Sequence, residues 1–361
     1  MNLEEKLKDA IRQAGRIPFE AFMHAALYDP REGYYFREPP PVGRTGDFVT
    51  APEMGPLFGE LVGIWIRRMW IGFGRPSCFV IEEHGPGRGG WAEAIVSFLE
   101  RTHPDCFAAM RYLLAEASPS MRRRISASCA GRFAAGHLRW AEDGPGKQDP
   151  PAFRLILANE FLDALPVHWV RREPGGLREV YVGWKEGRFQ EESGPVSDLR
   201  LEEYFGGKPV DLKEGRQAFL STRMADWLER ISGGNIPAMA LLVDYGSTAE
   251  VLHHPCRPSP KIACFSRHRA AWDPLSRPGR QDITADVDFT ALEWWARPLG
   301  WSRLKMQSQS AFLMELLPEA AGELSLLEED RRRNLKVLIH PEIMGEAFQV
   351  CLLGKNLPDK P

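Results

Sequence analysis

The sequence has 361 residues, of which 43% are hydrophobic and 26% are charged, and its formal net charge is −3 at pH 7. A chain of this length can hold one large α/β domain with insertions, or two domains that share an interface. No basic excess indicates a nucleic-acid surface, and the six cysteines contain no C-x-x-C pair. We therefore expect no nucleic-acid partner, no metal site and no disulfide framework.

The N-terminal segment predicts a surface helix instead of a targeting sequence. Leu3, Leu7 and Ile11 recur at helical spacing, and Gly15 follows as a C-cap signal. A secretory signal would need an unbroken apolar stretch, and a transit peptide would avoid the acids found here. No stretch reaches the length of a membrane span. These patterns predict a cytoplasmic protein without membrane insertion.

The first 75 residues are predicted to be mostly helical. A second helix is expected over residues 19–29 and a third over residues 57–71, where Trp65 and Trp70 are expected in the core. The stretch between these helices is too rich in proline and glycine for regular structure. Residues 1–75 are therefore expected to form an N-terminal helical region interrupted by one irregular loop.

From residue 76 the pattern changes to alternating strands and helices. Strand-like runs at 78–83, 111–116, 137–140 and 153–159 are separated by helical segments such as 91–103 and 119–130. This order implies a parallel sheet covered by helices on both faces. We therefore expect an α/β, Rossmann-like domain over residues 76–354.

An insertion is expected within that domain at about residues 167–235. Residues 167–172 and 177–184 look like antiparallel strands joined by an EPGG turn, and residues 215–232 look helical. A buried strand follows at 238–246. Residues 253–284 form a long irregular stretch of a kind that compact domains seldom keep without a functional reason.

A glycine-rich turn after the first strand predicts a nucleotide-type cofactor site. Gly85, Gly87 and Gly90 satisfy G-x-G-x-x-G between a strand and a helix, so the backbone can turn tightly beside the free N–H groups of the helix. Glu116 ends the next strand, where an acid binds ribose hydroxyls in Rossmann-type sites. The alternative for Glu116 is an exposed residue at the strand end.

Glu83 favours S-adenosylmethionine over a nicotinamide cofactor. It lies two residues before Gly85, where its carboxylate would repel a pyrophosphate but attract the ammonium group of a methionine moiety. Glu116 cannot distinguish the two cofactors, because both contain adenosine.

Several longer motifs run through most of the chain, namely GDFVTAPE (46–53), FGE (58–60), EHGPGRG (83–89), AEASPSMR (115–122), ANEFLDALPV (158–167), LLVDYG (241–246), PGRQDITADVDF (278–289) and MGEAFQV (344–350). These segments resemble those of the MidA-like methyltransferases, a family that includes an arginine methyltransferase of mitochondrial complex I assembly. The resemblance implies a class I methyltransferase fold with an N-terminal helical region, an insertion after the fourth strand, and Gly85, Gly87 and Gly89 beside the cofactor. Two departures are that PEMGPLFGE replaces the usual PEIS-type segment and that His84 replaces a small apolar residue.

Methyl transfer to arginine would need acids near the reactive methyl group. A guanidinium is a poor nucleophile while it is protonated, and carboxylates can hold it bidentately and accept its proton. Asn159 and Glu160 follow the fourth strand, and Asp163 would share the face of Glu160 if a helix starts there. We expect Glu160 and Asp163 to be catalytic and Asn159 to contact the cofactor. The alternative is that these residues cap the helix.

Further candidates lie in two irregular segments and at the end of one strand. In the loop GDFVTAPE, we expect Asp47 to be catalytic and Glu53 to contact substrate, although acids in such loops are often turn formers. Asp244 and His268 are weaker candidates for substrate contact, and Asp244 is equally compatible with a structural role. The loop GDFVTAPE also supplies two expected cofactor contacts, Gly46 and Thr50.

The leading hypothesis is an S-adenosylmethionine-dependent protein-arginine methyltransferase acting on a respiratory complex I-type subunit, with symmetric dimethylation implied by the family resemblance. One alternative is the same reaction on another acceptor. A second is a cofactor-bound assembly chaperone with little catalysis. A third, a nicotinamide-dependent oxidoreductase, is disfavoured by Glu83. A homodimer is also left open, since the apolar helix around Trp65 would suit either an interface or the core.

Overall fold

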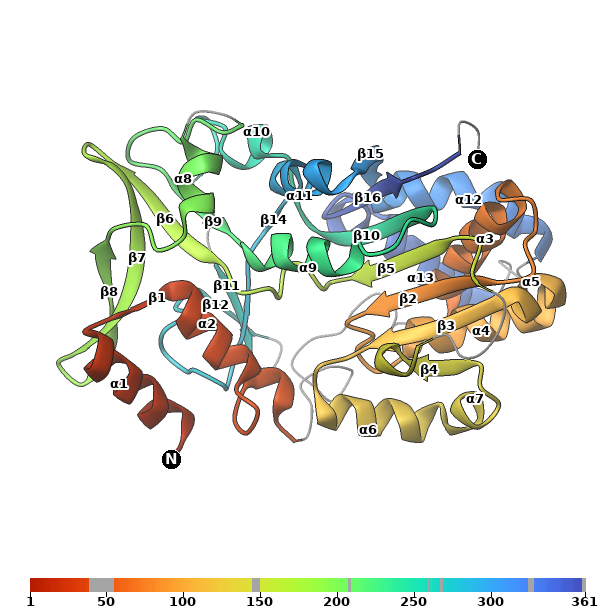
Figure 1. Ribbon diagram of the computed structural model, residues 1–361, viewed down its shortest axis with the longest axis horizontal. Coiled ribbons are helices and arrows are strands. Elements are labelled where there is room, and N and C mark those ends of the chain that lie inside the picture. The colour runs from red at the N-terminus through yellow and green to blue at the C-terminus, as the bar shows by residue number, and fades with distance from the viewer. Residues whose placement is uncertain are drawn as a thin grey trace.

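A mixed sheet forms the centre of the larger lobe in the computed structural model, which describes residues 1–38, 55–144, 150–206, 209–258, 260, 262–266, 269–323 and 328–358 (Figure 1). Its strand order is β15-β16-β10-β5-β2-β3-β4, and β14 pairs with the end of β10. The strands are β2 (Phe79–His84), β3 (Met110–Ala115), β4 (Leu138–Trp140), β5 (Arg154–Asn159), β10 (Ala238–Ser247), β14 (Val287–Asp288), β15 (Trp301–Ser308) and β16 (Phe348–Lys355).

The order of these strands positions the site. The neighbours from β4 to β10 run parallel, whereas β16 is antiparallel to both β10 and β15. The chain passes from β2 to β3 on one side and later returns to β5 on the other, so the order reverses at β2. In open α/β sheets, ligands bind at such a reversal, outside the carboxyl ends of the strands. The predicted Rossmann-like fold is confirmed.

Helices cover both faces of this sheet because its strands are apolar on both sides. Leu155 and Leu157 face a core that includes α3 (Leu57–Gly72) and α4 (Gly90–Thr102). Ile156 and Ala158 face the opposite core, with α9 (Arg223–Ile231) and α11 (Phe289–Ala296). The remaining covering elements are α5 (Pro104–Ala109), α6 (Pro119–Ser128), α7 (Ala130–Ala134), η3 (Ala141–Asp143), η4 (Arg297–Leu299), α12 (Gln309–Glu323), α13 (Glu329–Ile339) and η5 (Pro341–Gly345).

Two glycines allow α3 to lie directly against α4. A β-carbon on Gly59 would fall 2.5 Å from that of Ala94, and one on Gly63 would fall 2.6 Å from the ring of Phe98. Residues four apart share one face of a helix, so both glycines open the same face. Trp65 and Trp70, on the same helix, are buried. Their predicted place in the core is confirmed. The close packing of α3 supports α4, the helix that begins directly after the glycine turn.

The second lobe is built on an antiparallel sheet, as predicted for the insertion. Its strands are β1 (Ile17–Pro18), β6 (His168–Glu173), β7 (Gly176–Lys185), β8 (Arg188–Gly194) and β9 (Gln217–Leu220), and α8 (Leu199–Phe205) follows β8. The helix predicted over 215–232 forms only from Arg223 onward. The preceding residues form β9 instead, because Gln217–Leu220 hydrogen-bond along β6.

The N-terminal helices belong with this second lobe and not with the large sheet. Helices α1 (Leu3–Ala14) and α2 (Phe19–Tyr28) lie beside the insertion (Figure 1). Leu3, Leu7 and Ile11 are buried in the same core as Trp169. The stretch 253–284, which was expected to be irregular, contributes a small sheet to this core. The strands of this small sheet are β11 (Ala263–Ser266), β12 (Arg269–Ala271) and β13 (Asp282–Thr284). Two further short elements are η1 (Tyr34–Phe36) and α10 (Ala249–Leu252).

Within the described ranges, none of the helices is both long enough and apolar enough to cross a membrane.

Candidate active site

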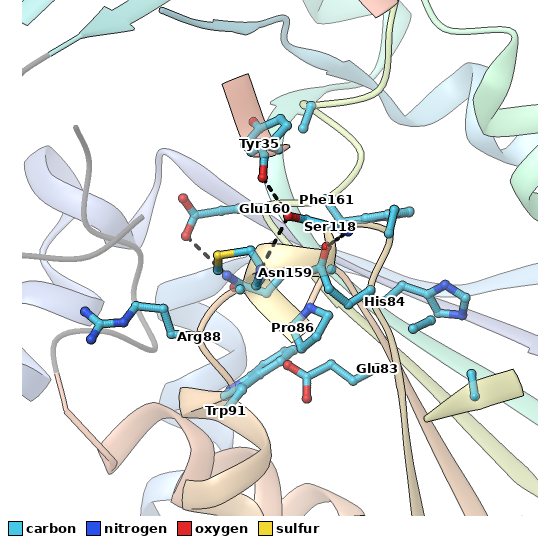
Figure 2. Close-up of a pocket in the computed structure, with 18 of the residues that line it drawn as sticks. Tyr35, Glu83, His84, Pro86, Arg88, Trp91, Ser118, Asn159, Glu160 and Phe161 are labelled. Carbon is cyan, nitrogen blue, oxygen red and sulfur yellow. Dashed lines mark hydrogen bonds between the residues drawn. The ribbon is translucent and has the colours of Figure 1, made fainter. Parts of the chain in front are cut away.

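A cavity of about 450 Å³ opens at the carboxyl ends of β2, β3 and β5. The turn after β2 forms its floor, and the segment around η1 covers it from the other lobe. Figure 2 shows Tyr35 at the top of the view, Glu160 below it, and Glu83 and Trp91 at the bottom. The volume lies in the range of cavities that hold small molecules and cofactors, roughly 300–1,000 Å³.

The predicted glycine turn adopts a backbone that only glycine takes easily. Gly85, Gly87 and Gly89 have φ angles of +66°, +56° and +79°. A β-carbon on Gly85 would lie 2.9 Å from the ring of Phe161, whereas no described atom lies within 4 Å of one on Gly87. Gly87 therefore leaves open space at the cavity, and Gly89 is the left-handed N-cap of α4.

Glu83 is a buried carboxyl group at the base of the cavity. Its side chain is 3% exposed, and the hydroxyl of Tyr112 on β3 donates a 2.8 Å hydrogen bond to its Oε2. Burial raises the pKa of Glu83 to about 7, because the charged form has lost most of its water. A cation bound beside Glu83 would restore the charged form. This is the property expected of a partner for the ammonium group of a methionine moiety.

Glu116 lies on the cavity wall directly after β3. Its Oε1 accepts a 2.7 Å hydrogen bond from the N–H of Ser118, and burial raises its pKa to about 7. The hydroxyl of Ser118 donates to the backbone oxygen of Tyr35 at 2.8 Å. Ser118 is also the N-cap of α6, as predicted. The end of β3 thus holds both an acid for the cavity and an anchor for the covering segment.

Asn159 and Glu160 form the opposite wall, at the end of β5. The amide of Asn159 donates from Nδ2 to Glu160 Oε1 at 3.2 Å, and its Oδ1 is buried without a partner among the described residues. Glu160 has a φ of +50°. A left-handed backbone costs a residue other than glycine about 1 kcal/mol or more, and such strain concentrates at functional sites.

Asp244, on β10, explains the conformation of this turn. Its Oδ2 accepts hydrogen bonds from the N–H groups of Phe161, Leu162 and Asp163 at 3.1, 2.8 and 3.3 Å. These N–H groups therefore do not enter a helix, and the helix considered for this segment does not form. Asp244 is 1% exposed, and burial raises its pKa to about 7. Its place beneath the turn, outside the cavity lining, favours the structural role of Asp244 over the substrate contact, which was the other possibility left open by the sequence.

Asp163 differs from its prediction. It lies in the turn and is 7% exposed, and it does not line the cavity beside Glu160. Burial, followed by the nearby carboxylates of Asp244 and Glu160, raises its pKa well above the usual range. Because the expected helix is absent, the spacing of three residues does not place Asp163 and Glu160 on one face. The place of Asp163 outside the cavity lining gives no support to the catalytic role predicted for it, which stays a prediction.

The covering residues of the cavity were not predicted. The hydroxyl of Tyr35 donates to Asp282 Oδ1 at 2.7 Å, and that of Tyr28 donates to the backbone oxygen of Ala164 at 3.0 Å. Trp227 and Arg230, from α9, also line the cavity. The aromatic run at 34–36 was the one available signal, but nothing local indicates that it returns to the strand ends.

Five predicted site residues cannot be placed. Gly46, Asp47, Thr50, Glu53 and His268 lie outside the described residues, so their roles stay predictions. Among the residues that the structure does describe, no three His, Cys, Asp or Glu side chains gather in a way that could hold a metal ion.

The chain matches known methyltransferases over nearly its whole length. Residues 61–307 match the model of a family described as S-adenosyl-L-methionine-dependent methyltransferases. The mitochondrial protein arginine methyltransferase NDUFAF7 homolog of Drosophila melanogaster is 31% identical, over 96% of this chain and 84% of that protein. Human NDUFAF7, also named a mitochondrial protein arginine methyltransferase, is 29% identical over 95% and 81%.

A solved structure shows the same architecture with a cofactor product. A Burkholderia thailandensis protein described as a methyl transferase, bound to S-adenosylhomocysteine, superimposes with a TM-score of 0.83 and 26% identity. The match covers 99% of this chain and 92% of that one. The cavity here fits such a ligand, because it combines open space at Gly87, two acids with raised pKa values and the unpartnered Oδ1 of Asn159.

The relatives also correct one prediction. The Drosophila, rat and human proteins are all named mitochondrial, which contradicts the cytoplasmic location inferred from the sequence. The acids of the N-terminal helix, on which that inference depended, do not determine the compartment.

The family match also excludes the nicotinamide-dependent alternative. S-adenosylmethionine is the cofactor, and the chain belongs to the MidA-like family of S-adenosylmethionine-dependent methyltransferases.

Proposed function

We propose that the protein transfers a methyl group to the guanidinium nitrogen of an arginine in another protein. The names of the Drosophila and human relatives support this acceptor. The single observation that carries the proposal is Glu160, a carboxylate presented to the cavity by a strained turn at the end of β5.

Glu160 has the chemistry that an arginine acceptor requires. A carboxylate can hold the guanidinium by paired hydrogen bonds and accept the proton released when the nitrogen is methylated. Burial raises the pKa of Asp163 well above its usual range, and Asp163 does not line the cavity. Glu160 is the acid of this turn that lines the cavity, and Asp244 fixes the turn backbone that presents it.

The other wall of the cavity would hold the cofactor, which when bound supplies an electrophilic methyl group on a sulfonium. We assign Glu116 to the ribose hydroxyls and Glu83 to the ammonium group. From the wall of Glu160, Asn159 is assigned to the same methionine end, because its Oδ1 lacks a partner among the described residues. The turn of Gly85, Gly87 and Gly89 would bring the backbone and the start of α4 close to the ligand.

The acceptor protein is proposed to be a respiratory complex I-type subunit, with symmetric dimethylation, on the strength of the family resemblance. Of the residues outside the described ranges, Asp47 is assigned to catalysis and Gly46 and Thr50 to the cofactor. Glu53 and His268 are assigned to the acceptor.

Comparative mass spectrometry tests the acceptor. Cells with and without the gene are grown with isotopically labelled methionine, and their methylated proteins are compared. We expect symmetric dimethylarginine at one or a few sites to disappear with the gene and to return with the wild-type protein but not with Glu160→Gln. Loss of methyl-lysine or of a methylated small molecule would contradict the arginine assignment. Rescue of subunit assembly by Glu160→Gln without methylation would favour the chaperone alternative.

A further inference from the structure

Three rings join the inserted subdomain to both walls of the cavity. His84 is the last residue of β2, Phe161 follows Glu160, and Trp227 lies on α9 of the insertion. The centroid of His84 lies 5.8 Å from that of Phe161 and 5.6 Å from that of Trp227, and Phe161 and Trp227 are also 5.6 Å apart. All three residues line the cavity. The end of β2, the turn after β5 and helix α9 therefore each contribute one ring to a single cluster.

The hydrogen bond from Trp227 determines which nitrogen of the neutral His84 ring carries the proton. The indole N–H of Trp227 donates to His84 Nδ1 at 3.2 Å, so this nitrogen carries no proton. The proton of the neutral ring is then on Nε2, which lies 3.0 Å from Glu82 Oε1 without the geometry of a hydrogen bond. The imidazole of His84 beside it lowers the pKa of Glu82. Among the described residues, the ring of His84 is therefore held by its hydrogen bond with Trp227.

We propose that His84 and Trp227 are positioning residues that couple α9 of the insertion to the cofactor turn and, through Phe161, to Glu160. There is little free space in this contact, since a β-carbon on Gly85 would lie 2.9 Å from Phe161. A shift of α9 would also move Arg230, which lies one turn after Trp227 on the cavity wall. The kinetic consequence rests on the proposed role of Glu160, whereas the coupling itself does not depend on the acceptor.

The test compares two tryptophans that each donate one indole hydrogen bond. Trp227→Phe keeps a ring but removes the donor to His84. Trp301→Phe removes a similar bond, of 2.8 Å, to Ser232 at the far end of α9. Hydrogen exchange of the α9 amides is measured with and without S-adenosylhomocysteine. We expect the ligand to slow exchange in the wild type and in Trp301→Phe but not in Trp227→Phe.

Kinetics and a second pair of variants complete the test. In Trp227→Phe, kcat should fall about fivefold while KM for the cofactor changes less than about twofold. His84→Asn offers an oxygen near the place of Nδ1 that can accept the indole N–H of Trp227. It should keep the ligand-dependent protection of α9, whereas His84→Ala should lack it.

Equal behaviour of Trp227→Phe and Trp301→Phe, or of His84→Asn and His84→Ala, would overturn the coupling. Because exchange needs only the cofactor product, this result is separate from any failure to find methylated arginine.

Discussion

The two walls of the cavity are built in different ways. The wall that we assign to the cofactor, called the cofactor wall, comes from the ends of two neighbouring strands and the segments after them, with Glu83, the glycine turn and Glu116. The wall that we assign to the acceptor, called the acceptor wall, joins distant segments, such as Tyr35 to Asp282 and the turn after Glu160 to Asp244. The first wall is defined by local backbone geometry. The second is defined by tertiary contacts, so remote substitutions can disturb methyl transfer while cofactor binding survives.

The largest effect is expected for Glu160→Gln, which should nearly abolish methyl transfer without changing cofactor affinity. Glu160→Gln should lower methyl transfer by at least about a thousandfold, because an amide can neither neutralise a guanidinium nor accept its proton. Affinity for S-adenosylhomocysteine, measured by calorimetry, should stay unchanged. Glu229→Gln, an exposed acid on α9, is the control. Unimpaired transfer of labelled methyl groups by Glu160→Gln would remove Glu160 from catalysis.

The support beneath the acceptor wall should be nearly as sensitive. Asp244→Ala deprives the N–H groups after Glu160 of their acceptor. We expect methyl transfer to fall about a hundredfold and the free energy of unfolding to fall by about 3 kcal/mol. Asp244→Asn keeps one oxygen and should lose less on both counts. Denaturant unfolding and transfer assays measure the two effects, and a fully active Asp244→Ala would show that the turn holds its shape without this anchor.

On the cofactor wall, one substitution should have opposite effects on binding and stability. The folded pKa of Glu83, about 7, exceeds the ordinary 4.5, so the folded protein holds this proton more tightly than the unfolded chain. The stability contribution of Glu83 is therefore lost as pH rises from about 4.5 to 7. Glu83→Gln should weaken cofactor binding about thirtyfold, yet stabilise the ligand-free protein at pH 8 by on the order of 2 kcal/mol. Thermal unfolding without ligand measures the gain in stability, and the added stabilisation by ligand measures the loss of binding. A destabilised ligand-free variant would contradict the raised pKa of Glu83 in the folded protein.

The same wall should make cofactor affinity depend on pH. Glu83 and Glu116 both have pKa values of about 7, and the ligand offers donors to their charged forms. Affinity for S-adenosylhomocysteine should thus fall by up to about tenfold per pH unit and per carboxyl group below pH 7. Glu83→Gln should show a shallower dependence. Equal affinities at pH 5.5 and 8 would mean that neither group must ionise on binding.

The smallest expected effect concerns the contact that closes the acceptor wall. Tyr35→Phe removes one hydrogen bond to Asp282 and should lower the free energy of unfolding by about 1 kcal/mol. Cofactor affinity should change little, because the backbone oxygen of Tyr35 still accepts from Ser118. Tyr181→Phe, which loses a bond on the surface of the insertion, is a matched control. A large loss of cofactor affinity would place Tyr35 on the cofactor wall instead.

This difference also explains what the sequence could predict. The parallel strands, the glycine turn and the acids at 83 and 116 follow from local patterns, and Glu160 follows from its place after a strand. The helix expected after Glu160, which would have put Asp163 beside it, does not form, because the buried carboxyl group of Asp244 receives the N–H groups of the turn. The contact between Trp227 and His84 joins residues 143 positions apart, and no local pattern encodes it.

The pairing of α1 with the insertion has a consequence for the order in which the chain folds. A protein is made from its N-terminus, and the core around Leu3, Leu7 and Ile11 includes strands that emerge much later, among them the one that holds Trp169. Helix α2 can cover part of this apolar stripe early, but the rest stays uncovered until the insertion has been synthesised. Helper proteins that shield nascent apolar segments would find a target in these residues.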